Sequence, residues 1–219
     1  MNARTKTRTK NRGFRAALIG CMVATAMIAG AEPALTQSVA ALPSPTAGAS
    51  VVGDARPVAA WVEFCQRHRE ECGVNPLEPA TIALTPRLWQ TIATVNRTVN
   101  AKIKALVDQE HWGTPDRWDF PLDGHGDCED YQLLKRKQLV EHGLPRRAMR
   151  MTVVIDEKGE GHAVLMIRTD RGDLILDNKT DAVLPWHQTG YVYVKREGQD
   201  GLGWVSLGGA TSPTVTANR

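Results

Sequence analysis

The spacing of apolar residues changes at Pro145, and this change limits the folds that the chain can adopt. Before Pro145, apolar residues recur every three or four positions, which is the period of a helix. After Pro145, short runs of β-branched and apolar residues alternate with turn residues, and the runs are 151–155, 162–168, 173–176 and 191–194. Helices followed by short, closely spaced strands predict an α+β domain whose strands form an antiparallel meander.

Two helices are expected before Pro145. The first is amphipathic, and its apolar face consists of Ile92, Val95, Val99, Ile103 and Val107. The second extends from Glu129 to His142 and stops at Gly143. Cys128 is therefore expected at the N-terminal end of a helix, where unpaired N–H groups and the positive end of the helix dipole lower a thiol pKa and can donate to an oxyanion.

The first 31 residues have the features of a secretory signal peptide. Six Lys and Arg residues without an acidic one lie between positions 4 and 15, an apolar run follows from 16 to 31, and Ala29, Gly30 and Ala31 form the expected cleavage site. The apolar run is shorter than a typical membrane span and no second run of this kind follows, so no stable membrane anchor is expected. The expected location is the bacterial periplasm or the outside of the cell.

Cleavage after Ala31 would leave residues 32–219, enough for one domain. Residues 32–56 are rich in Pro, Ala, Ser and Gly and are expected to form a flexible leader, residues 208–219 a flexible tail, and residues 57–207 the folded domain. Without residues 1–31 the chain has 21 basic and 24 acidic residues, a formal charge of −3. The basic balance of the whole chain therefore does not indicate a nucleic-acid partner.

Cys65 and Cys72 are seven positions apart in a polar stretch before a glycine. In an oxidising compartment such a pair can close a small disulfide loop, which is the favoured interpretation. A metal site would need two further ligands, and His68 between the cysteines is more typical of a solvated surface residue. Cys128 is then an unpaired thiol at risk of oxidation, which indicates a chemical role, with a buried structural thiol as the alternative.

Cys128, His162 and Asp177 are residues of the types that serve as a cysteine nucleophile, its general base and the residue that orients the base. If Thr169–Gly172 is a four-residue turn, Val164 faces Asp177 on the neighbouring strand, and His162 lies two residues away on the same face. A three-residue loop would put His162 and Asp177 on opposite faces. Each residue alone is more often an ordinary strand or turn residue, but the combination favours a catalytic triad.

Several segments carry a resemblance to a known family: Val95-Asn96 with Val99-Asn100, Gly126-Asp127-Cys128-Glu129-Asp130-Tyr131, Gly143-Leu144-Pro145, Gly161-His162-Ala163-Val164-Leu165 and Leu176-Asp177-Asn178. Over about residues 61–203 the chain resembles the bacterial transglutaminase-like cysteine peptidases. The resemblance implies a papain-like α+β fold, in which the catalytic cysteine begins a helix that packs on an antiparallel sheet. It also implies that Cys128 is the nucleophile, that His162 is the general base and then the acid, and that Asp177 fixes the imidazole.

Asp127, Glu129 and Asp130 surround Cys128, and their negative charge is expected to make the thiol harder to ionise. In the best-known members of the family, periplasmic proteases that cleave a large surface adhesin, acids that flank the cysteine hold calcium. Asp127 and Glu129 match those positions, so the resemblance implies calcium as a cofactor. Calcium needs six or more oxygen ligands, and further candidates are Asp116, Asp119 and Asp123. The alternative is that Asp127 and Glu129 only cap the helix.

Three functions are consistent with these residues. The favoured one is an exported cysteine endopeptidase, which hydrolyses peptide bonds of a protein substrate through a thioester. The alternatives are a transglutaminase, in which a lysine amine replaces water, and a non-catalytic calcium-responsive binding module. A surface adhesin is a candidate substrate by analogy alone, because the pair Cys65 and Cys72 is not a feature that we associate with the adhesin-cleaving members.

Overall fold

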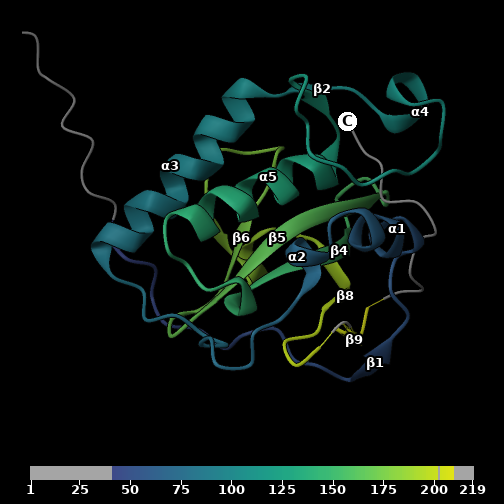
Figure 1. Ribbon diagram of the computed structural model, residues 1–219. Helices are drawn as coiled ribbons and strands as arrows, with labels where there is room; N and C mark the ends of the chain where they lie inside the picture. The colour runs from purple at the N-terminus through teal and green to yellow at the C-terminus, as the bar shows by residue number, and fades with distance from the viewer. Residues whose placement is uncertain (1–40, 202, 210–219) are drawn as a thin grey trace, which may run out of the picture. The chain divides into compact units, whose positions relative to one another are not determined.

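A seven-stranded antiparallel sheet forms the centre of the computed structural model, which describes residues 41–201 and 203–209 (Figure 1). The order of its strands is β1-β9-β8-β4-β5-β6-β7. Their bounds are β1 Gly53–Ala55, β4 Met149–Ile155, β5 Gly161–Thr169, β6 Gly172–Leu176, β7 Leu184–Pro185, β8 Val192–Glu197 and β9 Trp204–Ser206. The α+β class and the antiparallel sheet expected from the sequence are confirmed.

The path of the chain through the sheet differs from a simple meander. Strands β4, β5 and β6 follow one another as expected, but β8 returns to the other side of β4 and pairs with it. The expectation that all four predicted strands form one meander is therefore wrong. Strands β1, β7 and β9 contain only two or three residues each, too few to produce an alternating pattern in the sequence.

The turn between β5 and β6 has the length on which the proposed site depends. Thr169 pairs with Gly172 and Leu165 pairs with Leu176, so the turn is the four-residue one. Gly172 has a φ of 93°, which a residue with a side chain rarely adopts. This register puts Val164 level with Asp177, as predicted.

The helices lie mainly on one face of the sheet (Figure 1). Helix α5 packs against β4 and β5, and α3 packs against α5. The helices are α1 Ala59–Arg67, α2 Arg69–Cys72, α3 Pro86–Lys102, α4 Asp108–His111 and α5 Cys128–Glu141, with single 3₁₀ turns at Arg146–Ala148 and Trp186–Gln188. Helix α5 confirms the helix that the sequence predicts directly after Cys128.

The boundaries of α3 follow from its end residues. The Thr85 side chain accepts a hydrogen bond from the Leu88 N–H, and Pro86 occupies the first turn, where its missing N–H costs nothing. The helix ends at Lys102, although the apolar spacing continues to Val107. Beyond Lys102 the chain forms β2 (Lys104–Ala105), which pairs in parallel with β3 (His125–Gly126).

Residues 41–56, part of the predicted flexible leader, pack against the folded domain. Ala49 lies on the face of the sheet opposite the helices, whereas Leu42 and Ala55 pack against the main core. The Ala49 N–H donates to Asp173 Oδ2 at 2.8 Å, and Ala49 is buried with Val154, Val164 and Ile175. β1 pairs with β9. This part of the chain is therefore held by backbone hydrogen bonds, which its composition does not reveal.

Two further predictions concern the ends of the chain. The predicted signal peptide, residues 1–31, and positions 210–219 of the predicted tail lie outside the described residues. Within the described ranges, no helix is long and apolar enough to cross a membrane.

Candidate active site

Cys128 is the first residue of α5 and is fully buried. Its Sγ accepts a hydrogen bond from the Ala163 N–H at 3.4 Å and donates one to Glu129 Oε2 at 3.1 Å. Burial raises the pKa of the thiol well above its usual value, and the charges of Glu129 and Asp127 raise it further. The lower pKa expected from the helix N-terminus is therefore not found, because lost hydration and two nearby carboxylates outweigh the helix dipole.

His162 and Asp177 face each other across β5 and the end of β6. The distance from His162 Nε2 to Asp177 Oδ1 is 2.8 Å, and both side chains are buried. His162 Nδ1 is buried without a hydrogen-bond partner. The Ala163 N–H, which directly follows His162 in β5, donates to Cys128 Sγ, so the backbone at His162 lies next to the thiol. The structure thus places the three predicted site residues in one region of the fold.

The carboxylate of Asp177 is held in its ionised form. Burial opposes ionisation, but the hydrogen bond and the charge of His162, with further donors from the Lys179 N–H and the Tyr191 hydroxyl, lower the pKa of Asp177 to about 2. A pocket of about 260 Å³ opens beside Asp177 and Tyr191. Asp177 can therefore act as a fixed negative charge next to the imidazole.

Two asparagines of α3 hold the loop that follows Asp177. Asn100 Nδ2 lies 3.0 Å from the carbonyl oxygens of Asp177 and Thr180, and Asn96 Nδ2 lies 3.0 Å from that of Thr180 and 3.1 Å from that of Asp181. The sequence singles out both asparagines as part of the family resemblance but assigns them no role. Their contacts show that α3 fixes the backbone of Asp177.

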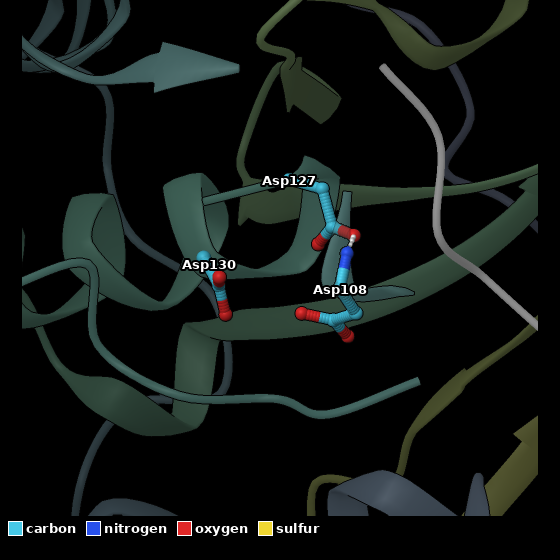
Figure 2. Close-up of side chains that lie close together, drawn as sticks. All are labelled: Asp108, Asp127 and Asp130. Carbon is cyan, nitrogen blue, oxygen red and sulfur yellow. Dashed lines mark hydrogen bonds between the residues drawn. The ribbon is translucent and has the colours of Figure 1, made fainter. Parts of the chain in front are cut away.

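A cluster of acids lies at the start of α5, where Asp127 and Glu129 flank Cys128 in the sequence. Figure 2 shows three members of the cluster, Asp108, Asp127 and Asp130. Two sets of three carboxylates each have ligand atoms within 4.8 Å of one another: Asp108, Asp127 and Asp130, and Asp108, Asp116 and Glu129. Asp127 and Glu129, which the sequence predicts as metal ligands, are both fully buried. The Asp127 side chain makes no capping hydrogen bond to α5, and its Oδ2 instead accepts from the Asp108 N–H at 3.3 Å.

The carboxylates of this cluster have too few hydrogen-bond donors or positive charges around them to be stable in the ionised form. Burial raises the pKa of Asp127 to about 7, with the charge of Asp108 adding to the effect, and burial and neighbouring acids also raise the pKa values of Glu129 and Asp130. One carboxylate oxygen each of Asp108, Asp127 and Glu129 is buried without a hydrogen-bond partner. Buried oxygens of this kind call for protons or a cation.

The structure separates the three other candidate ligands that the sequence suggests. Asp116 lies in the cluster. Asp119 forms ion pairs with Arg67 and Arg117 and a hydrogen bond with His68, and the exposed Asp123 forms a hydrogen bond with His111. Neither belongs to the cluster.

Asp108 is the member that the sequence did not reveal. It precedes Asp127 by 19 residues and no motif marks it. The parallel pairing of β2 with β3 brings its segment alongside the start of α5, and this pairing is too short to predict.

Cys65 and Cys72 form a disulfide with a Cα–Cα distance of 5.6 Å. The predicted structural staple is confirmed, and both sulfurs are unavailable to a metal. Cys128 does not take part in this disulfide, as expected.

Comparisons with known proteins place the chain in a family. Two solved structures of Legionella pneumophila LapG resemble it. The calcium-bound form is 24% identical, and the match covers 57% of this chain and 72% of the LapG chain with a TM-score of 0.48. The EGTA-treated form is 27% identical, and the match covers 54% of this chain and 67% of the LapG chain with a TM-score of 0.46. No curated protein matches the chain. The model of the bacterial transglutaminase-like cysteine proteinases (BTLCP) matches residues 52–212, which is most of the sequence. The chain therefore belongs to the bacterial transglutaminase-like cysteine proteinases and is a cysteine peptidase.

Proposed function

We propose that this cysteine peptidase is an exported endopeptidase that cleaves a protein substrate with Cys128 as nucleophile, His162 as base and acid, and Asp177 as the group that orients His162. The observation that carries this proposal is the joint placement of the three residues. His162 Nε2 is 2.8 Å from Asp177 Oδ1, and the next N–H along the strand, that of Ala163, donates to Cys128 Sγ. The unpartnered Nδ1 of His162 is then the nitrogen available to the thiol.

The reaction follows from these groups. Nδ1 of His162 takes the thiol proton, and Cys128 Sγ attacks the substrate carbonyl carbon to give a tetrahedral oxyanion. N–H groups at the start of α5 are positioned to donate to that oxygen. His162 returns its proton to the leaving amine, the C–N bond breaks, and a thioester remains. Water, deprotonated by His162, then hydrolyses the thioester and releases the acid product and the free thiol.

We propose calcium as a cofactor held by Asp127 and Glu129, with Asp108 and Asp116 as further ligands. The fit rests on the oxygens themselves: hard carboxylate ligands suit calcium, and those of Asp127, Glu129 and Asp108 include buried oxygens without partners. A bound cation would supply positive charge next to a thiol whose pKa these acids raise. The calcium-bound form of LapG is a second reason to test this ion.

Export through the predicted signal peptide to the periplasm or the medium is part of the proposal. The Cys65–Cys72 disulfide supports it, because disulfides persist mainly in oxidising compartments. A surface adhesin is the substrate that the family resemblance suggests.

The test is to incubate the purified protein with a proteome-derived peptide library in calcium and in EGTA, beside Cys128→Ala. Mass spectrometry would identify both new peptide termini and new lysine cross-links. We expect new termini that require Cys128 and that decrease in EGTA. Cross-links without new termini would show acyl transfer to lysine instead of hydrolysis. Neither product, with the protein folded in calcium, would contradict the proposed endopeptidase.

A further inference from the structure

Tyr191, which follows Asp177 by 14 residues, contacts the proposed triad. Its hydroxyl donates to Asp177 Oδ2 at 2.7 Å, whereas Oδ1 of the same carboxylate accepts from His162 Nε2 at 2.8 Å and from the Lys179 N–H at 3.0 Å. Within the described residues, Tyr191 is the donor to Oδ2. Each oxygen of the carboxylate is thus held, and the side chain cannot rotate without losing a hydrogen bond to a charged acceptor.

The ring of Tyr191 also meets the imidazole. The two ring centroids are 5.8 Å apart with an interplanar angle of 80°, an edge-to-face arrangement. One side chain therefore contacts both His162 and the residue that orients it. The Tyr191 hydroxyl holds the Asp177 carboxylate, and the Tyr191 ring limits the tilt of the imidazole.

The segment before β8 is built to hold Tyr191 in place. The Tyr191 N–H donates to Thr189 Oγ1 at 3.3 Å, and the Thr189 hydroxyl lies 2.9 Å from the Trp186 carbonyl oxygen and 3.0 Å from the Tyr193 hydroxyl. Gly190, between them, has a φ of 77°, which permits the turn that brings the ring to the site. Tyr191 is thereby supported independently of Asp177.

We propose that Tyr191 is a positioning residue of this active site, which holds the Asp177 carboxylate and the His162 ring so that Nδ1 remains directed at Cys128. The inference rests on the proposed function, because it assigns Tyr191 a part in the same triad. A tyrosine that only filled space would need a partner for its hydroxyl but not this partner. Tyr193 shows the ordinary case, since its buried hydroxyl pairs with Thr189 and not with the triad.

Tyr191→Phe removes the hydroxyl and keeps the ring, and Tyr193→Phe is the matched control on the same strand segment. With a library peptide as substrate and calcium held constant, we expect Tyr191→Phe to lower kcat about tenfold with KM unchanged, as for one lost hydrogen bond to a charged group. Tyr193→Phe leaves Thr189 bonded to the Trp186 carbonyl oxygen and to the Tyr191 N–H, so it is expected to keep the parent kcat. All variants are compared at a temperature below the melting transition of each.

A double-mutant cycle with Asp177→Asn separates positioning from a general structural effect. If Tyr191 acts through Asp177, adding Tyr191→Phe to Asp177→Asn should reduce kcat by less than twofold. An equal tenfold loss in both backgrounds would overturn the proposal, and so would a parent-like kcat for Tyr191→Phe.

Alkylation of Cys128 by iodoacetamide, followed by intact mass, gives a readout that needs no substrate. We expect Tyr191→Phe to slow it about tenfold at neutral pH, because a loosely held His162 takes the thiol proton less often. An unchanged alkylation rate would count against the positioning role. If the parent protein cleaves no peptide, the proposed function fails, while this comparison still decides the role of Tyr191.

Discussion

At Cys128 two influences on the thiol pKa oppose each other. The helix N-terminus favours the thiolate by up to about 1 kcal/mol when it is exposed, whereas complete burial beside Glu129 and Asp127 favours the thiol by more. The residue proposed as nucleophile is therefore in a site that hinders its ionisation. Neutralising the nearby acids, by protons or by a cation, is what would make Cys128 reactive.

The same acids predict how stability depends on pH without calcium. Because the pKa of Asp127 is raised to about 7 in the folded state, the folded protein binds more protons than the unfolded chain between about pH 4 and 7. Stability should then fall as pH rises through this window, by on the order of 4 kcal/mol from Asp127 alone. In EGTA we expect a lower melting temperature at pH 8 than at pH 5.5, measured by calorimetry.

Asp127→Asn provides the control, since an uncharged side chain should flatten this dependence. Excess calcium should remove most of it in the parent protein. Asp177 and Asp156, whose pKa values are lowered to about 2, contribute stability that is lost only below about pH 4, outside this window. Equal melting temperatures at both pH values in EGTA would show that the cluster does not carry the buried charge that we describe.

At the residue scale, the sequence predicts what depends on short-range geometry. The pairing of His162 with Asp177 follows from one turn length, and the place of Cys128 follows from the start of one helix. Asp108 could not be predicted, because its approach to Asp127 depends on the two-residue pairing of β2 with β3.

At the scale of elements, the relation between α3 and the loop after β6 matters most for the site. Asn96 and Asn100, one helical turn apart, donate to carbonyl oxygens of the loop at 177–181. Carbonyl groups in such a loop need donors when they lie away from water. Helix α3 therefore supports the proposed active site through the backbone of this loop.

Asn100→Ala should loosen this loop. We expect a loss of about 1–3 kcal/mol in the free energy of unfolding, measured in urea, because the substitution leaves loop carbonyls without their donor. We also expect kcat to fall by about tenfold as Asp177 becomes mobile. Arg97→Ala, at an exposed position of the same helix, should change neither quantity. A normal kcat in folded Asn100→Ala would mean that the Asp177 side chain is held sufficiently by its other partners.

Elements were predictable in proportion to their length. Helix α5 and strands β4, β5, β6 and β8 have enough residues to show a period, whereas β1, β7 and β9 do not. The end of α3 was missed because apolar spacing persists through Ile103 to Val107, although the helix itself stops at Lys102. The spacing of apolar residues indicates which side chains are buried, but it does not show where the backbone stops being helical.

At the scale of the whole molecule, the Cys65–Cys72 disulfide links α1 to α2, and α2 is contacted by residues from other parts of the chain. The Glu71 carbonyl oxygen, next to Cys72, accepts from Arg136 of α5 at 3.2 Å and from Arg146 at 2.9 Å. The disulfide thus stabilises a junction between the N-terminal helices and the helix that begins with Cys128.

Replacing both cysteines by serine should lower the free energy of unfolding by about 2–3 kcal/mol, the chain-entropy value for a loop of this length. Activity at a temperature well below melting should remain, because neither cysteine belongs to the proposed site. Urea denaturation with and without reductant checks both statements. The reduced parent should match the double variant, and a stability unaffected by reductant would contradict the role of the disulfide.

The long-range arrangement of the chain was the least predictable. The return of β8 to β4 and the contact of residues 41–56 with the sheet both join segments far apart in sequence. The leader contributes mainly backbone groups, such as the Thr46 N–H that donates to the Arg171 carbonyl oxygen at 3.2 Å. Backbone groups are the same in every sequence, so composition could not indicate that this segment docks.

Backbone pairing also divides the site between regions that open at different rates. Strand β5, which carries His162, has partner strands on both sides, so its amide hydrogens should exchange with solvent only when the whole sheet opens. The pairing of β2 with β3, which brings Asp108 to Asp127, involves two residues on each strand and can open locally. An ion shared by these acids would slow exchange in the loop and leave β5 unchanged. The calcium concentration around the protein would then set how often the surroundings of Cys128 open, while His162 stays in place.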